Sequence, residues 1–192
     1  MASMETTSEA SARTQPASLL PTLLVGAVAL VVAIVFLASS SWFTVFLTIH
    51  ILFVVIWIGG GALLTFLGIM AQRTQDNAQL AQLARQAAFA GERLFAPSAL
   101  IVVAAGIGMV LNVGYGFDHF WLLFGFLGFL TTFVLGIAVL SPMAKRANTM
   151  IEEKGPNHPD VQAYGAKILL IARADVAMLM LVIVDMVAKP FS

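Results

Sequence analysis

One histidine in a long apolar run is the residue best suited to chemistry in this sequence. His50 is followed by Trp57 and by the three glycines at 59–61, and apolar residues fill the gaps between them. A neutral imidazole can ligate haem iron, ligate copper or carry a proton. A titratable group is costly inside a bilayer, so its presence there favours a functional role. The structural alternative is a hydrogen bond between helices, to Asp185 or to a backbone carbonyl, and both interpretations stay open.

The residues that follow His50 are candidates to shape a pocket beside it. Trp57 lies seven residues after His50, which places the two on one face of a regular helix. Trp57 is expected chiefly to pack against other helices, with the lining of a porphyrin pocket as the lesser interpretation. Gly60 and Gly61 are expected to allow close helix packing. The less favoured interpretation is that they make room for a flat ligand. His50, Trp57, Gly60 and Gly61 form the candidate cofactor-binding set.

Further candidate groups lie on later segments. Asp185 could pair with His50, relay protons or reach the nearby membrane interface. Met109 is a candidate metal ligand together with His50, because a thioether suits copper. Arg93 and Arg173 are candidate ion-pair or proton partners nearer the opposite membrane surface.

Composition limits the classes of protein and of site. The chain has 192 residues, of which 60% are hydrophobic and 10% charged, whereas soluble domains carry about 25% charged residues. Its formal net charge is zero, so no basic surface for nucleic acid is expected. It has no cysteine, which excludes disulfides, thiolate metal sites, iron–sulfur clusters and covalently attached c-type haem. No nucleophile–base pair or phosphate loop is visible, so an enzyme is the less favoured class.

Five apolar segments must position these groups. Residues 19–70 are almost uninterrupted apolar sequence, too long for one crossing of a hydrocarbon core about 30 Å thick. They must turn back near the serines at 39–41. The sequence therefore predicts an all-α polytopic membrane bundle, a four-helix core plus an N-terminal helix. The five transmembrane helices are expected at residues 19–39, 42–70, 94–112, 121–140 and 168–188.

The segments between these helices differ in character. Residues 1–18 are predicted to be a mobile, disordered cytoplasmic tail, and residues 71–92 a helical extension outside the bilayer. A short turn is expected at 114–119, and residues 141–167 are expected to form the longest polar loop. The predicted organisation is a tail at 1–18, an additional transmembrane helix at 19–39 and a four-helix membrane domain at 42–190.

Lys and Arg are distributed unequally between the two sides that five crossings create. One side has Lys189 alone, and Arg173 lies inside the last helix toward the other side. By the positive-inside rule we expect a bacterial inner (cell) membrane protein with its N-terminus in the cytoplasm and its C-terminus outside. The expected cytoplasmic residues are Arg13, Arg73, Arg85, Arg93, Lys145, Arg146, Lys154 and Lys167.

The stretch from His50 resembles a motif of small bacterial four-helix membrane proteins: His, six residues, Trp, one residue, Gly. Families with this motif include copper-resistance D, the membrane-bound haem-containing protoporphyrinogen oxidase, and a family of predicted integral membrane proteins without assigned function. The third is the most similar, because Arg93-Leu-Phe-Ala-Pro97 and Met186-Val-Ala-Lys189-Pro190 resemble its other motifs. The resemblance covers roughly residues 42–190. The oxidase family's Arg-Leu pair is replaced here by Ala62-Leu-Leu-Thr65, which argues against porphyrinogen oxidation.

These observations favour a non-enzymatic membrane protein. The leading hypothesis is a haem-associated or accessory subunit of a membrane electron-transfer complex, with haem b as cofactor and the bilayer and other membrane subunits or copies of itself as partners. The alternative is a copper or small-solute permease with a site in the outer leaflet. A tetrapyrrole-modifying oxidase is the third hypothesis, and a protein without any cofactor is also compatible with the residues.

Overall fold

The computed structural model describes residues 19–190, and every regular element among them is a helix. The predicted all-α class is confirmed. The chain divides into two compact units, one ending at Ser40 and the other beginning at Ser41. The predicted tail at 1–18 lies outside the described residues.

The first unit contains α1, Leu20–Leu37. Pro21 lies in its first turn, where a missing N–H costs least because the first amides of a helix have no intrahelical acceptor. α1 is long and apolar enough to cross a membrane.

The second unit is built from four long helical rods. The first three each consist of two α-helices joined by one wider π turn, and the fourth is a single α-helix. Rod 1 consists of α2 (Trp42–Val54), η1 (Val55–Gly59) and α3 (Gly60–Arg73), and rod 2 consists of α4 (Asn77–Ala90), η2 (Gly91–Phe95) and α5 (Ala96–Val113). Rod 3 consists of α6 (Phe120–Leu135), η3 (Gly136–Leu140) and α7 (Ser141–Lys154), and rod 4 is α8 (Pro159–Ala188).

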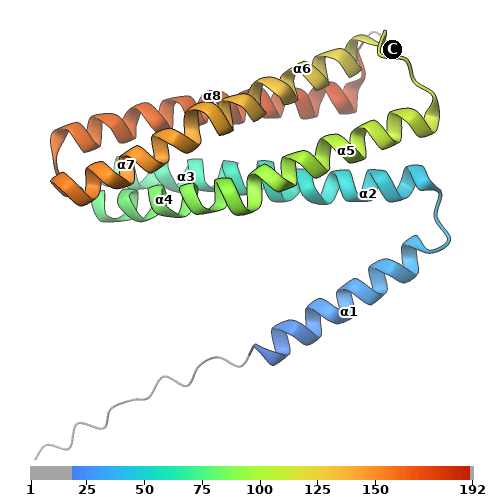
Figure 1. Cartoon of the computed structure of the whole chain (residues 1–192), viewed down its shortest axis with the longest axis horizontal. Coiled ribbons are helices and arrows are strands. Elements are labelled where there is room, and N and C mark those ends of the chain that lie inside the picture. Colours follow the sequence, from blue (N-terminus) through green and yellow to red (C-terminus); the bar gives the residue numbers. More distant parts are fainter. Residues whose placement is uncertain (1–18, 191–192) are drawn as a thin grey trace, which may run out of the picture. The chain divides into compact units, whose positions relative to one another are not determined.

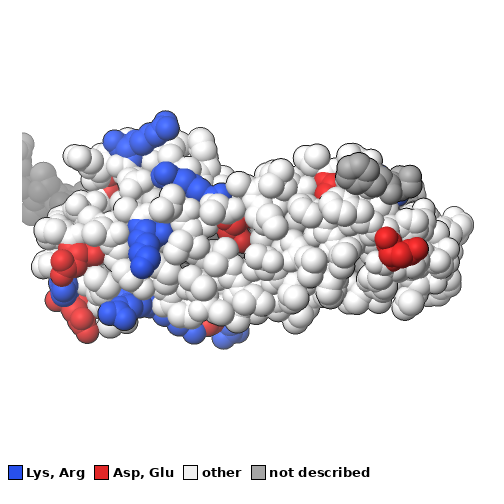
Figure 2. Space-filling view, turned by 90° about the horizontal axis from the view of Figure 1, so that it is seen from above, with Lys and Arg blue, Asp and Glu red and all other residues white. Residues whose placement is uncertain are grey.

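The rods pack differently in the two halves of the unit. In one half α2 runs along α5, and α6 runs along α8 (Figure 1). In the other half α4 packs against both α3 and α7, and α8 contacts α3 and α7. We call this second half the charged half, because Lys and Arg gather over it in Figure 2.

Length and composition support membrane crossing. Within residues 19–190, α1 and rods 1 to 3 are long and apolar enough to span a bilayer. α8 is 30 residues long and carries Arg173, Asp175 and Asp185 in its apolar part. These five stretches match the predicted polytopic bundle with an N-terminal helix.

Residues 141–167 do not form the predicted polar loop. α7 occupies Ser141–Lys154 and α8 begins at Pro159, so only residues 155–158 are non-helical. The cause is that Lys, Arg and Glu are good helix formers. A fall in hydropathy indicates where a helix leaves the hydrocarbon, and the helix itself can continue beyond that point.

Each π turn has a local cause in the sequence. η2 ends two residues before Pro97, and η3 ends two residues before Pro142. A proline has no N–H, and its ring collides with the carbonyl of the preceding turn of an α-helix. A wider turn before the proline gives that carbonyl room. η1 directly precedes Gly60 and Gly61, which leave the backbone free of side-chain crowding.

Candidate functional site

His50 lies at the contact between α2 and α5. Its Nδ1 is 2.8 Å from the backbone carbonyl oxygen of Val102. A side chain at Gly106 would begin 3.5 Å from the imidazole ring, which is ordinary van der Waals contact, so the ring packs directly beside this glycine. A carbonyl can only accept, so Nδ1 donates the proton and the neutral ring keeps its lone pair on Nε2. The structure thus places His50 in a hydrogen bond between helices, with one ring nitrogen available as a ligand or base.

A shallow depression lies one helical turn from His50 along the same contact. It has a volume of about 410 Å³ and is lined by Trp42, Phe46, Gly108, Leu111 and Asn112. Phe46 lies four residues before His50, and its ring packs where Gly108 has no side chain. The surroundings of His50 on this side are therefore mostly aromatic and apolar, with Asn112 as the polar residue.

Trp57 does not share the face of His50, contrary to the prediction. Its ring packs edge-to-face on Phe129 of α6, with 5.5 Å between the ring centroids. The reason is that Trp57 lies within η1 (Val55–Gly59), where the wider turn rotates each residue by a smaller angle than in an α-helix. Trp57 therefore does not take the direction that seven residues of regular α-helix would give it. Trp57 instead lines a large cavity of the bundle.

The two candidate glycines have different surroundings. A side chain at Gly60 would begin 2.7 Å from the Phe95 ring, so this glycine permits close packing of α3 on η2. A side chain at Gly61 would meet nothing within 4 Å, and Gly61 lines the same cavity as Trp57.

Asp185 faces α6, away from the α2–α5 contact that holds His50. Its side chain is only 6% exposed, and its Oδ2 lies 3.7 Å from the position that a side chain at Gly125 would take. Within residues 19–190, Oδ2 has no hydrogen-bond partner. Lys189 does not pair with it either: the ammonium lies 5.1 Å from the centroid of the Trp121 ring.

The remaining candidates are spread over the unit. Arg173 donates a 2.9 Å hydrogen bond to Gln72, and Arg93 is exposed. Met109 is half-buried on α5. No group of three or more His, Asp or Glu side chains that could hold a metal ion occurs in the described part of the chain.

A large cavity lies in the charged half, between all four rods. Its volume is about 760 Å³, and small or apolar side chains form most of its wall. Asp175 reaches it from α8, and the Oδ1 of this carboxylate is buried without a partner among the described residues. At the rim Lys145 of α7 forms an ion pair with Glu92 of η2. His50 is not part of the cavity wall.

The chain matches a known protein family. Residues 44–190 match the family described as predicted integral membrane protein (DUF2269). The chain belongs to this family. As a DUF2269 protein it is a multi-pass integral membrane protein in contact with lipid, and the resemblance to this family is confirmed. The similarity to copper-resistance D and to protoporphyrinogen oxidase stays a resemblance. No curated protein and no solved structure matches the chain.

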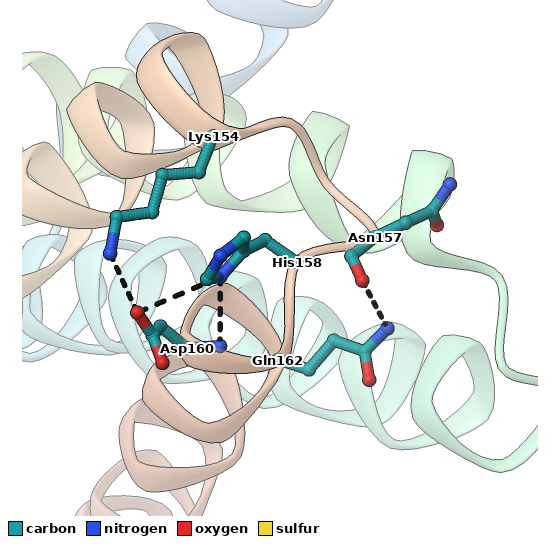
Figure 3. Close-up of polar contacts among 5 residues, drawn as sticks. All are labelled: Lys154, Asn157, His158, Asp160 and Gln162. Carbon is teal, nitrogen blue, oxygen red and sulfur yellow. Dashed lines mark hydrogen bonds and ion pairs between the residues drawn. The ribbon is translucent and has the colours of Figure 1, made fainter.

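The turn between α7 and α8 in this DUF2269 protein is held by a polar cluster (Figure 3). Lys154 donates a 2.6 Å hydrogen bond to Asp160, and the Asp160 backbone N–H donates to Nδ1 of His158 at 3.2 Å. Gln162 donates to the carbonyl of Asn157 at 3.4 Å. The hydrogen bond from Lys154, together with its charge, lowers the pKa of the Asp160 carboxyl.

The cavity and Asp175 were not predicted from sequence as a site. The available signals were Pro97 and Pro142, which mark the π turns, and an acidic residue within an apolar helix. Which rods face each other could not be read from one chain, so the meeting of these residues was not visible.

Proposed function

We propose that this protein is a haem-associated, non-enzymatic accessory subunit of a membrane electron-transfer assembly, with His50 as an axial ligand of haem b. The observation that carries the proposal is the 2.8 Å hydrogen bond between His50 Nδ1 and the Val102 carbonyl. Ligating histidines typically donate their second ring nitrogen to a carbonyl or carboxylate, which fixes the tautomer and the orientation of the ring.

The surroundings of His50 support a cofactor shared with a partner. The imidazole lines neither the large cavity nor the shallow depression, which lies one helical turn away along the α2–α5 contact. Trp42, Phe46 and Leu111 would supply apolar contacts to a porphyrin at this place, and a second subunit would cover its other side. When bound, haem supplies one-electron transfer. This chain would contribute the ligand, its orientation and a dry environment.

The function also requires a location and an orientation of the chain in a membrane. We place the protein in a bacterial inner membrane with the charged half toward the cytoplasm, since Lys and Arg favour that side. Rod 1 then enters from the outer surface, which puts His50 in the outer leaflet. The partner is another membrane subunit or a second copy of this chain.

The test is the visible absorption spectrum of the protein purified from membranes in mild detergent. We expect a Soret band that His50→Ala removes, because the iron loses its axial ligand. His119→Ala is the matched control, since His119 lies in the turn between α5 and α6 and should leave the band unchanged. A well-folded wild-type protein without a Soret band after haem addition would contradict the proposal.

The same preparations test the copper alternative by metal analysis. Copper bound in a fixed ratio by the wild type, and lost in both His50→Ala and Met109→Ala, would favour a permease over a haem subunit.

A further inference from the structure

The large cavity is bordered by every irregular turn of the three composite rods. Trp57 of η1, Gly91 of η2 and Gly136 of η3 all contribute to its wall. π turns in α-helices occur frequently at functional sites, because the wider turn redirects side chains and loosens the helix. Because three π turns border one cavity, we infer that the sequence itself specifies this space between the rods.

Four glycines keep the cavity open. Gly61, Gly91, Gly136 and Gly165 come from different rods, all line the cavity, and a side chain at any of them would meet nothing within 4 Å. At some other glycines of the bundle a neighbouring side chain occupies the space: at Gly68 a side chain would begin 2.7 Å from Leu169. The volume of about 760 Å³ is within the range of sites that bind small organic molecules.

The charges on the cavity wall favour a positively charged group. Glu92 and Lys145 neutralise each other in an ion pair at the rim. Asp175 is the remaining charged residue of the wall, and its buried Oδ1 has no partner among the described residues. Arg173 lies two residues away but is engaged with Gln72. A carboxylate in an apolar wall is best satisfied by a ligand that brings both a charge and a donor.

We propose that this cavity binds an apolar molecule carrying one protonated amine, with Asp175 as its counter-ion. The small and apolar wall residues contact the body of the ligand, and the ammonium donates to the Asp175 carboxylate. This site is separate from His50 and does not depend on haem binding.

The test uses three planar fluorescent probes of similar size: 9-aminoacridine, which is cationic at neutral pH, acridine, which is neutral, and 9-anthracenecarboxylate, which is anionic. Binding is measured by fluorescence anisotropy to the full chain in phosphatidylcholine nanodiscs, with empty nanodiscs as the blank. We expect saturable binding of the cation, weaker binding of the neutral probe and the weakest binding of the anion.

Two variants locate the binding site, and each has a matched control. Asp175→Asn should weaken binding of the cation by roughly 10- to 100-fold and leave the neutral probe unchanged. Asp185→Asn removes another buried carboxylate of α8, which lies outside the cavity, and should leave the affinity for all three probes unchanged. Gly61→Leu should block all three probes by filling the cavity, whereas Gly59→Leu, which also has open space but lies outside the wall, should not.

Equal affinity for the three probes, or an Asp175→Asn variant that binds the cation as well as the wild type does, would overturn the amine specificity. A folded wild type with no saturable binding of any probe would overturn the site itself. If a variant fails to fold, the comparison of the three probes on the wild type decides between these outcomes.

Discussion

Gly60 and Gly61 are neighbours in sequence, but side chains added to them would meet opposite surroundings. At Gly60 the added atom would begin 2.7 Å from the Phe95 ring, and at Gly61 it would enter open cavity space. We expect Gly60→Ala to lower the free energy of unfolding by about 1–3 kcal/mol, because overpacking forces rings and backbone to move. Gly61→Ala should instead raise it by up to about 1 kcal/mol, because alanine has the higher helix propensity and the added methyl group meets open space.

The measurement is reversible unfolding of both variants in mixed detergent micelles, followed by helical circular dichroism. Gly60→Ala and Gly61→Ala have the same intrinsic effect on helix propensity, so each serves as the control for the other. Equal destabilisation of the two would mean that the close contact between Gly60 and Phe95 does not limit packing.

At this scale the sequence identified His50 as an unusual residue but could not identify its partner. Hydropathy shows that a polar group lies in an apolar segment, but it does not show which neighbouring group that side chain faces. Val102 accepts its hydrogen bond through a backbone atom, and every residue has that atom, so no side-chain pattern marks the pairing. Asp185 was the more visible candidate because it is a carboxylate, and it faces α6 instead.

At the scale of the elements, hydropathy predicted the apolar helical segments better than it predicted where the helices end. The predicted helix at 94–112 is the apolar part of a rod that begins at Asn77, and the predicted helix at 121–140 continues to Lys154. The π turns were not predicted, although Pro97 and Pro142 mark two of them. The error about the face of Trp57 comes directly from the undetected η1.

The turn between α7 and α8 gives a test at this scale. The Asp160 pKa lies below its ordinary value of 3.8 because of the ion pair with Lys154. The ion pair therefore stabilises the folded protein at pH values above 3.8. This stabilisation is lost as the pH falls through the lower pKa of the folded state. Lys154→Met should raise the Asp160 pKa, since it removes both the hydrogen bond and the charge. Carboxyl carbon-13 shifts during a pH titration measure it.

Lys167→Met is the control for this titration, because Lys167 is an exposed lysine like Lys154 but lies further along α8, away from the α7–α8 turn. An Asp160 pKa that is the same in the wild type and in Lys154→Met would show that the ion pair does not form in solution.

At the scale of the whole molecule, the orientation in the membrane can be read with single cysteines because the natural chain has none. Glu153 is exposed near the α7–α8 turn, and Asp118 is exposed in the turn between α5 and α6. With the proposed orientation, Asp118→Cys should react with a membrane-impermeant maleimide added to intact cells. Glu153→Cys should react only after the membrane is opened.

Labelling of Glu153→Cys in intact cells, with Asp118→Cys protected, would reverse the proposed orientation and move His50 to the cytoplasmic leaflet. Labelling of opened cells provides the control that both cysteines are accessible to the reagent.

The π turns also affect how the gene could change. Removing one residue from a regular α-helix rotates everything beyond it by about 100° relative to the part before it, which normally destroys packing. A π turn already contains one residue more than the α-helical path needs, so a single codon deleted within 55–59, 91–95 or 136–140 can be absorbed by return to the α-helical ladder. These three short stretches are therefore the places inside the membrane domain where evolution could have inserted a residue, and could remove one, without changing the rods on either side.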